Sequence, residues 1–599
     1  QPFTENGDLS PFTNFGITSN PALVRDEVTR ENNVTQIIGN VQATYRFTDW
    51  LSLRTLWGLD WRNTRDTDIR SPIATGPPDN GSINRGFTRV LNWNTNTVIN
   101  ASQSFGDHNI SGLVGMEYRR QRADELESTG IGLPNGLFDV ASAAATPDFV
   151  QGFDTEFRIA SYFGKVDYNF KEKYLLSATV RTDGSSRFGE DNRWGVFPAV
   201  SGGWRISEED FFNSDFVDEL KIRASFGVTG NNQIGNFASR GLFQVNGSYA
   251  GLSALQPDQL ANNRLSWEEK TEVNVGIDFS FFRGRLSGSA NAYKSTNDDL
   301  LLDRPLPRAS GFNSITDNIG ELEVRGLEFD MEATLLDRND LLIRGNLNWA
   351  IQANEITDLV GDQEQINSGT ANTLAVGQPI GTWFVSKFAG VNPADGRAMW
   401  YDADGNITYD PSVADRKFSD GGEQDVVGGF GTTISYKRLS INTFFQYSLG
   451  GTAMPRTEQF FLRSTGGFNM NTLRSALRRW QEPGDVTDLP KNFLGEVNPT
   501  SSTQQSFFTT HSGTLEKTNY LRLKNLTVSY DIPKLNEYLN VKRVALYFTG
   551  LNLVTWDDWT GLDPEVAGDG DGEGVLVGRA QDSTIPTARQ FVGGIEIDF

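Results

Sequence analysis

The chain has 599 residues, with 61 glycines, 13 Trp, 15 Tyr, 40 Phe and no cysteine. Its 53 basic and 76 acidic residues give a formal net charge of −23, which argues against a nucleic-acid-binding protein because phosphates need a basic surface. The lack of cysteine excludes disulfides and thiolate metal sites. Two histidines, His108 and His511, give little basis for a histidine metal centre or a Ser-His triad.

Many aromatic residues, much glycine and no cysteine indicate a large all-β protein. Two alternatives remain at this point: a soluble propeller or sandwich, and a β-barrel in the outer membrane. No apolar run approaches the ~18 residues of a membrane-spanning helix. Strand length separates the alternatives, since a tilted strand takes ~9–11 residues to cross a bilayer, whereas globular strands cluster near ~5–6.

The first predicted strands are long and two-faced. Val41, Ala43, Tyr45 and Phe47 alternate with polar residues over 39–47, and a second alternating strand follows a short turn. The same pattern recurs along the chain in about nine pairs, or about 18 strands. The other short turns are predicted at 107–109, 171–173, 283–284, 437–438 and 534–540.

Longer polar stretches separate these hairpins. They cover residues 63–85, 123–153, 230–264, 358–377 and 452–518. Short turns at one end and long loops at the other are typical of outer-membrane barrels. The sequence therefore predicts one all-β domain over residues 1–599, an antiparallel transmembrane barrel with long extracellular loops and short periplasmic turns. The apolar face of the strands would contact lipid, and the charged face would line a water-filled interior. The last strand alternates apolar residues from Phe591 and Ile595 to Phe599, similar to the signal read by the barrel-assembly machinery.

Several motif blocks occur in a fixed order. R-T-D-G-S-S-R-F-G occupies 181–189, and L-K-I-R-A-S-F-G-V-T-G-N-N-Q-I-G occupies 220–235. Y-L-R-L-K-N-L-T-V-S-Y at 520–530 and G-L-D-P-E-V at 561–566 follow near the other end. With these blocks the chain resembles the SusC-like (SusC/RagA) TonB-dependent outer-membrane transporters. The residues that carry the resemblance are Arg181, Asp183, Gly184, Arg187, Phe188, Gly189, Trp194, Gly195, Trp204, Gly550, Asn552, Leu553, Trp556, Asp563, Pro564 and Phe599.

The resemblance implies a barrel of about 22 strands with a plugged lumen in the outer membrane of a Gram-negative bacterium. It implies TonB-dependent import of a large nutrient, an oligosaccharide or a peptide, and a SusD-like surface lipoprotein that closes over the barrel as a lid. Pairing of two transporter–lid units into a homodimer is a further implication. An outer-membrane hydrolase is a further alternative, but it needs a Ser-His arrangement. His108 lies in a predicted tight turn and His511 has no nearby Gly-x-Ser-x-Gly element, so no enzyme activity and no catalytic residue are predicted.

The chain departs from the family at its amino-terminal side. No signal peptide, TonB box or plug is recognisable, so the sequence is expected to be the carboxyl-terminal barrel portion of a longer chain. An alternative function is a family barrel that serves as a structural subunit of an outer-membrane assembly or secretion complex, without transport of its own.

Two groups of aromatic residues have different expected roles. One group near strand ends is expected to form the girdle at the membrane interfaces; it comprises Trp50, Trp57, Trp61, Trp93, Tyr174, Tyr293 and Trp349. The other group lies near predicted loops, where flat rings can stack on sugar faces and make candidate substrate-binding residues. Loop packing and partner contact are the other interpretations of these residues, which are Trp400, Tyr401, Trp480, Trp556 and Trp559.

Two acidic, glycine-rich segments are candidate Ca²⁺ sites in extracellular loops, because Ca²⁺ prefers oxygen ligands. The first contains Asp402 and Asp404, and the second contains Asp569, Asp571 and Glu573. Solvated turns are the alternative, and no other cofactor is predicted. Arginines expected to face the lumen either pair with acids in the wall or contact a plug or a solute; they are Arg46, Arg54, Arg181, Arg187, Arg193, Arg205, Arg223 and Arg325.

Overall fold

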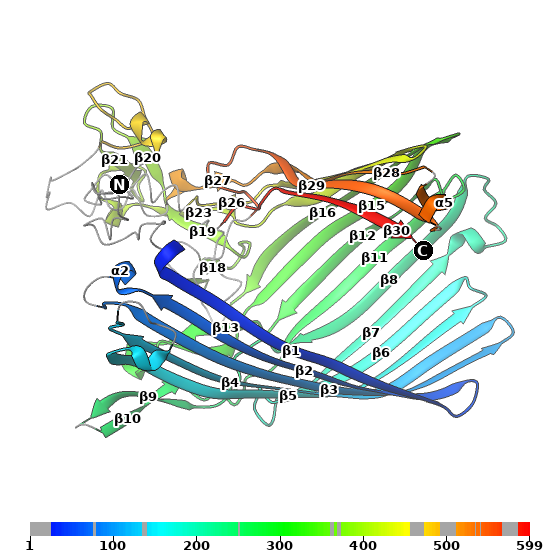
Figure 1. Cartoon of the computed structure of the whole chain (residues 1–599), viewed down its shortest axis with the longest axis horizontal. Helices are drawn as coiled ribbons and strands as arrows, with labels where there is room; N and C mark the ends of the chain where they lie inside the picture. The colour runs from blue at the N-terminus through cyan, green and yellow to red at the C-terminus, as the bar shows by residue number, and fades with distance from the viewer. Residues whose placement is uncertain are drawn as a thin grey trace.

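The computed structural model describes residues 25–75, 79–134, 140–249, 252–359, 364–367, 373–455, 473–491, 511–533, 535–539, 541–565 and 585–598. Seventeen strands form one curved antiparallel sheet (Figure 1). Each strand pairs with its sequence neighbours in the sheet, so the chain runs up and down the wall as a meander. This arrangement confirms the predicted all-β antiparallel class, with 17 wall strands where about 18 were expected.

The wall begins with long strands and continues with shorter ones. Its strands are β1 (Val28–Arg46), β2 (Leu51–Arg70), β3 (Ser82–Phe105), β4 (His108–Ile131), β5 (Thr146–Phe170), β6 (Tyr174–Ser185), β7 (Trp194–Arg205), β8 (Val217–Asn231), β11 (Glu268–Phe281), β12 (Leu286–Asp298), β15 (Glu321–Arg338), β16 (Leu341–Asp358), β24 (Val426–Tyr436), β25 (Leu439–Leu449), β28 (Tyr520–Asp531), β29 (Arg543–Asp557) and β30 (Gln590–Asp598).

The loops carry the smaller elements. These are the strands β9 (Leu242–Tyr249), β10 (Leu252–Gln259), β13 (Leu301–Pro305), β14 (Ser314–Asn318), β17 (Gln365–Asn367), β18 (Thr373–Ala375), β19 (Thr382–Ser386), β20 (Phe388–Val391), β21 (Ala398–Tyr401), β22 (Ile407–Thr408), β23 (Arg416–Gly421), β26 (Thr452–Ala453) and β27 (Glu516–Lys517). The helices are α2 (Pro72–Thr75), α5 (Leu535–Leu539) and 3-10 turns at Ala141–Ala143, Ile206–Glu208, Arg308–Ser310, Pro411–Val413, Arg474–Arg478 and Ser512–Thr514. None of the described helices is long and apolar enough to cross a membrane.

The wall strands expose one apolar face. On β11, Val273, Val275 and Ile277 are 49%, 48% and 42% exposed, whereas the intervening Asn274 and Asp278 are half-buried on the other face. A soluble sheet protein would bury such valines in a core. The exposed apolar face therefore contradicts the soluble alternative and fits a surface that lies against lipid.

The short connections fall at one end of the wall and the long loops at the other (Figure 1). β5 and β6 are joined by a tight turn in which Lys171 and Glu172 have φ of 54° and 55°. Such left-handed pairs match the twist of adjoining strands. The predicted asymmetry between turns and loops is thus confirmed in the described part of the chain.

The first strands extend far beyond a bilayer. β3 and β4 have 24 residues each and β5 has 25, whereas a spanning strand takes ~9–11. On their outer face, the ring centres of Trp93 and Tyr118 lie 5.1 Å apart. Charged side chains follow these rings toward the long loops. Arg122, for example, pairs with Asp124 at 2.9 Å. The outer surface therefore changes from aromatic to charged where the wall leaves the membrane.

Most of the predicted girdle lies on the outer face. Trp50, Trp57 and Tyr174 are exposed, and Trp349 stacks on Phe329 at 5.8 Å. Tyr293 was predicted wrongly: it pairs with Asn274 across the strands and so lies on the inner face, because β12 presents its even-numbered residues to lipid.

Arg325 was also assigned to the wrong face. It pairs in register with Lys294, which lies opposite the lipid-facing Val273, and it forms an ion pair with Glu323 on the outer face. Leu327, two residues along the same strand, is 49% exposed on that face.

The described wall has two edges. β1 pairs with β2 and β30 pairs with β29, and no pairing joins β1 to β30 among the described residues. Among the described residues, the buried apolar side chains form four small clusters in and beneath the long loops and no single central core. One of them contains Phe188, Phe197 and Trp267. The clusters therefore organise the end of the wall that carries the loops.

Candidate functional site

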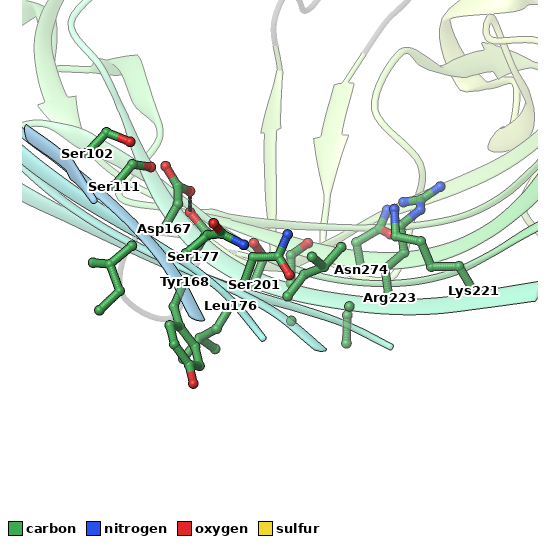
Figure 2. A pocket seen from close by; sticks show the side chains of 18 of the residues that line it. Ser102, Ser111, Asp167, Tyr168, Leu176, Ser177, Ser201, Lys221, Arg223 and Asn274 are labelled. Carbon is green, nitrogen blue, oxygen red and sulfur yellow. Dashed lines mark hydrogen bonds between the residues drawn. The ribbon is translucent and has the colours of Figure 1, made fainter. Parts of the chain in front are cut away.

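The inner face near the short turns contains a broad polar concavity of about 720 Å³ (Figure 2). Ser102, Ser111 and Ser177 line it with their hydroxyl groups, while Tyr168 and Leu176 point away to the outer face. The alternation of each strand places these small polar residues inside, because the apolar positions between them face lipid. The concavity can hold water, polar solute or a polar protein surface.

Charged groups in this concavity are paired within the wall. Ser177 donates to Asp167 at 2.7 Å. Asp278 accepts from Arg223 at 3.0 Å and lies 3.3 Å from the Lys221 ammonium group. For Arg223 the predicted ion pairing in the wall is confirmed, so its charge is already compensated.

A second cleft of about 490 Å³ opens between the end of β16, the loop strands β19 and β23, and the segment 423–425 that precedes β24. Its lining includes Gln352, Asn354, Phe418, Glu423 and Asp425. Asn354 donates to Glu423 at 2.6 Å, and the Phe418 ring is 41% exposed. An exposed ring beside amides and carboxylates offers both a stacking surface and hydrogen-bond partners. This cleft was not predicted from the sequence, because its residues come from segments far apart in the chain.

Three of the five candidate substrate-binding aromatics do not offer a free ring. Trp400 is 1% exposed in a cluster with Ala398 and Leu489, and Trp559 is 6% exposed. Trp556 is exposed, but it lies on the outer face of β29 in line with the Phe445 ring at 6.5 Å. The stacking prediction is therefore wrong for these three residues, because their rings are used in loop packing or in the lipid-facing surface.

Tyr401 and Trp480 lie near Trp400 in the loop region. The Lys387 ammonium group sits 4.9 Å from the Tyr401 ring centre, and Trp480 donates from Nε1 to the Pro393 carbonyl at 2.9 Å. Both side chains are half-buried. A role in substrate binding remains a prediction for these two residues.

The first acidic segment is a hydrogen-bonded turn. Asp402 Oδ1 accepts from the backbone N–H groups of Asp404 and Asn406 at 3.0 and 2.8 Å. Across the described residues, no three His, Cys, Asp or Glu side chains are grouped to hold a metal ion. A Ca²⁺ site at Asp402 and Asp404 stays a prediction. Asp569, Asp571 and Glu573 lie outside the described residues, as does Phe599.

The two histidines have local partners. His108 Nδ1 lies 2.8 Å from the Tyr168 hydroxyl, and His511 is buried and accepts at Nδ1 from the Gly513 N–H at 3.1 Å.

The first motif block builds the wall and its rim. Arg181 Nε donates to Asp183 at 2.8 Å, and its guanidinium also reaches Ser161 at 2.8 Å and Glu117 at 3.5 Å. Gly184 faces the Trp194 ring, where a Cβ would come within 2.8 Å of ring atoms, so only glycine fits. Arg181 and Gly184 therefore serve the wall itself.

The remaining residues of this motif block hold the loops together at the loop end of the wall. Phe188 is 1% exposed and packs 5.2 Å from Trp267. A Cβ at Gly189 would come within 2.6 Å of the Asn263 carbonyl, and one at Gly195 would overlap the Phe197 ring. The aromatic cluster under the loops thus requires these two glycines.

Trp204 and the last blocks have separate structural roles. Trp204 Nε1 donates to Glu209 at 2.9 Å near a short turn. Asn552 has a φ of 54° at a β-bulge in β29, next to Leu553 and close to the buried Gly550.

The most deeply buried ion pair among the described residues was not predicted from the sequence. Arg522 on β28 faces inward, with its side chain 3% exposed, and donates to Asp563 and Glu565 at 2.5 Å each. Lys524 contacts Glu565 at 2.6 Å. The two motif blocks at 520–530 and 561–566 thus form one network that holds the root of the β29–β30 loop against the inner wall. The only signal in the sequence was that the block at 520–530 carries basic residues and the block at 561–566 carries acidic residues.

Asp563 gives this network a pH dependence. Burial opposes its ionisation, but hydrogen bonds from Arg522 and from the backbone N–H groups of Thr587 and Glu565 lower the pKa of the Asp563 carboxyl below its ordinary value. A depressed pKa adds stability above the unfolded value near 3.8, and that stability is lost as the pH falls through the folded pKa.

We expect the melting temperature of Asp563→Asn to fall less between pH 6 and pH 3 than that of the parent protein. Thermal unfolding in detergent at each pH checks this. Asp404→Asn, at an exposed position, is the control and should keep the parental pH dependence. An Asp563→Asn profile parallel to that of the parent would contradict the role of this carboxyl.

Comparison with known proteins identifies the family to which this chain belongs. The family model described as "TonB dependent receptor-like, beta-barrel" matches residues 1–553. The chain belongs to this family. It is therefore an outer-membrane protein of a Gram-negative bacterium, in a family of transporters rather than enzymes, as predicted.

Individual relatives agree with the SusC/RagA resemblance. TonB-dependent receptor P26 of Formosa agariphila is 28% identical over 626 residues, covering 98% of this chain and 61% of the relative. TonB-dependent receptor SusC of Bacteroides thetaiotaomicron is 27% identical, covering 99% of this chain and 59% of SusC. The chain thus spans about three-fifths of the length of these relatives.

A solved structure also superposes on the whole chain. The RagAB peptide transporter aligns with a TM-score of 0.86 and 26% identity, covering 100% of this chain and 66% of the RagAB chain. The SusC/RagA-like barrel predicted from the motif blocks is confirmed by this agreement.

Proposed function

We propose that the complete protein imports a large nutrient, an oligosaccharide or a peptide, across the outer membrane together with a SusD-like lid lipoprotein. The observation that carries this proposal is the superposition of the entire chain on the RagAB peptide transporter. The polar inner face supports it, since hydroxyl groups and paired charges line a passage suited to a hydrated solute.

In the proposed mechanism, the solute is trapped between the lid and the long loops and then released inward. The cleft around Phe418 and Glu423 would contact the solute at the mouth, and the serine-rich concavity would line its path toward the short turns. TonB would supply energy through the amino-terminal region of the complete protein. Two transporter–lid units would associate as a dimer.

Gene deletion tests the function. A strain without the gene should lose growth on one polymeric or peptide nutrient and keep growth on its monomers, and deletion of the lid gene should give the same defect. Complementation with the intact gene should restore growth. Unchanged growth on every nutrient, with general envelope defects instead, would contradict import and favour the structural-subunit alternative.

A further inference from the structure

Two guanidinium groups converge on one aromatic ring at the inner face. Arg187 Cζ lies 4.3 Å and Arg119 Cζ lies 5.5 Å from the centre of the Phe157 ring. Phe157 is 6% exposed, so the ring is fixed by its surroundings. Because Arg119 is on β4, Phe157 is on β5 and Arg187 follows β6, consecutive parts of the wall build this arrangement.

Neither positive charge is compensated within the described residues. No carboxylate oxygen there lies within 4.0 Å of either guanidinium. Arg187 donates from Nε to the Asn236 amide oxygen at 2.9 Å and from one terminal nitrogen to the Asn232 carbonyl at 2.8 Å, and both acceptors are neutral. Arg119 is exposed. The neighbouring Arg181, in contrast, has two carboxylate partners.

The surroundings of Arg187 favour an added negative charge. Burial and the nearby charge of Arg119 lower the pKa of the Arg187 guanidinium. Arginine nevertheless stays protonated in proteins, so an anion beside Arg187 would offset both the burial of its charge and the repulsion from Arg119. The loop that carries Arg187 holds the group in place through Asn232, whose amide donates to Ser185 at 3.0 Å.

The position of the pair suits a solute that enters from outside. Arg119 directly follows Tyr118, which lies in the aromatic belt beside Trp93 below the charged outer surface. The pair therefore lies inside the wall at about the height of the outer membrane surface. A chain with a net charge of −23 repels anions overall, so an anionic solute needs a local positive site to enter.

We propose that Arg119 and Arg187 bind an anionic group, a carboxylate or a sulfate, carried by the transported solute. This inference rests on the proposed import function. A guanidinium presents paired N–H donors that match the oxygens of such groups. Arg119 offers donors that no described residue occupies, while Arg187 adds charge from a fixed position. The site would favour solutes with acidic groups over neutral solutes of the same size.

Chemical labelling tests the site directly. Phenylglyoxal modifies arginines, and mass spectrometry of the purified complete transporter reads the rate at each residue. Glucuronate or sulfate at roughly four times its dissociation constant should slow the modification of Arg119 about fivefold, since the free fraction of the site is then about one fifth. Glucose at the same ionic strength should have no effect. Arg62, exposed on β2 without a carboxylate within 4.0 Å in the described residues, should not be protected.

The Arg187→Gln variant separates a paired site from a single exposed arginine. With its melting temperature checked, it should abolish the protection of Arg119 by glucuronate and sulfate. Equal protection of Arg119 and Arg62 by the anions would overturn the proposal. So would an Arg119 that resists labelling before any anion is added, since a protein carboxylate would then occupy the site. These outcomes leave the growth experiment unaffected, so the two proposals fail independently.

Discussion

Arg522→Ala should destabilise the protein by about 3–5 kcal/mol, the cost of leaving buried carboxylates without their cation. Arg522 and Asp563 have side chains only 3% and 4% exposed, and Glu565 shares the same guanidinium. Removing the arginine leaves the carboxyl of Asp563 without its cation in a place that water hardly reaches. The free energy of unfolding of the complete protein in detergent, measured by denaturant titration, checks this value.

Arg543→Ala is the matched control for this experiment. Arg543 also contacts two carboxylates, Asp531 at 2.8 Å and Glu596 at 3.0 Å, but its side chain is 39% exposed. Exposed pairs contribute about 0–1 kcal/mol, so this variant should lose little stability. Equal losses in the two variants would contradict the structural role assigned to the Arg522 network.

Val275→Arg should cost about 2–4 kcal/mol and reduce the amount of folded protein in the outer membrane, because it places a charge at the centre of the lipid-facing strand surface. Val275 lies in the middle of β11 with its side chain 48% exposed on the apolar face. Gel electrophoresis of unheated samples, in which folded barrel and unfolded protein migrate differently, measures the folded fraction in membranes.

Asn274→Arg provides the matched control one residue away. Asn274 lines the polar concavity on the opposite face, where water can solvate an added charge. Its folded fraction should stay close to that of the parent. A larger loss for Asn274→Arg than for Val275→Arg would show that the faces have been assigned in reverse.

Local patterns predicted the wall well because a strand has only two faces. Once Val273, Val275 and Ile277 are placed outside, Asn274 and Asp278 must lie inside. The errors came from single residues assigned without following their own strand. Leu327 shares a face with Arg325, so the alternation of β15 already indicated that this arginine lies outside.

The loop end was harder to predict because its contacts join distant residues. Arg522 and Asp563 are 41 positions apart, and only the return of the β29–β30 loop onto β28 brings them together. Trp400 looked available for stacking because it adjoins polar turns, yet the packing of Leu489 and Phe388 buries it. A tryptophan in a loop buries a large apolar surface, so covering it stabilises the loop more than leaving it open does.

Alternate residues of the wall strands face lipid and the water-filled interior. The accessibility of spin labels, attached to cysteines introduced one at a time at positions 272–277, measures this directly. The parent chain has no cysteine of its own. Positions 273, 275 and 277 should be accessible to oxygen dissolved in the bilayer, and positions 272 and 274 to a water-soluble nickel complex. Loss of this two-residue alternation, or its inversion, would contradict the account.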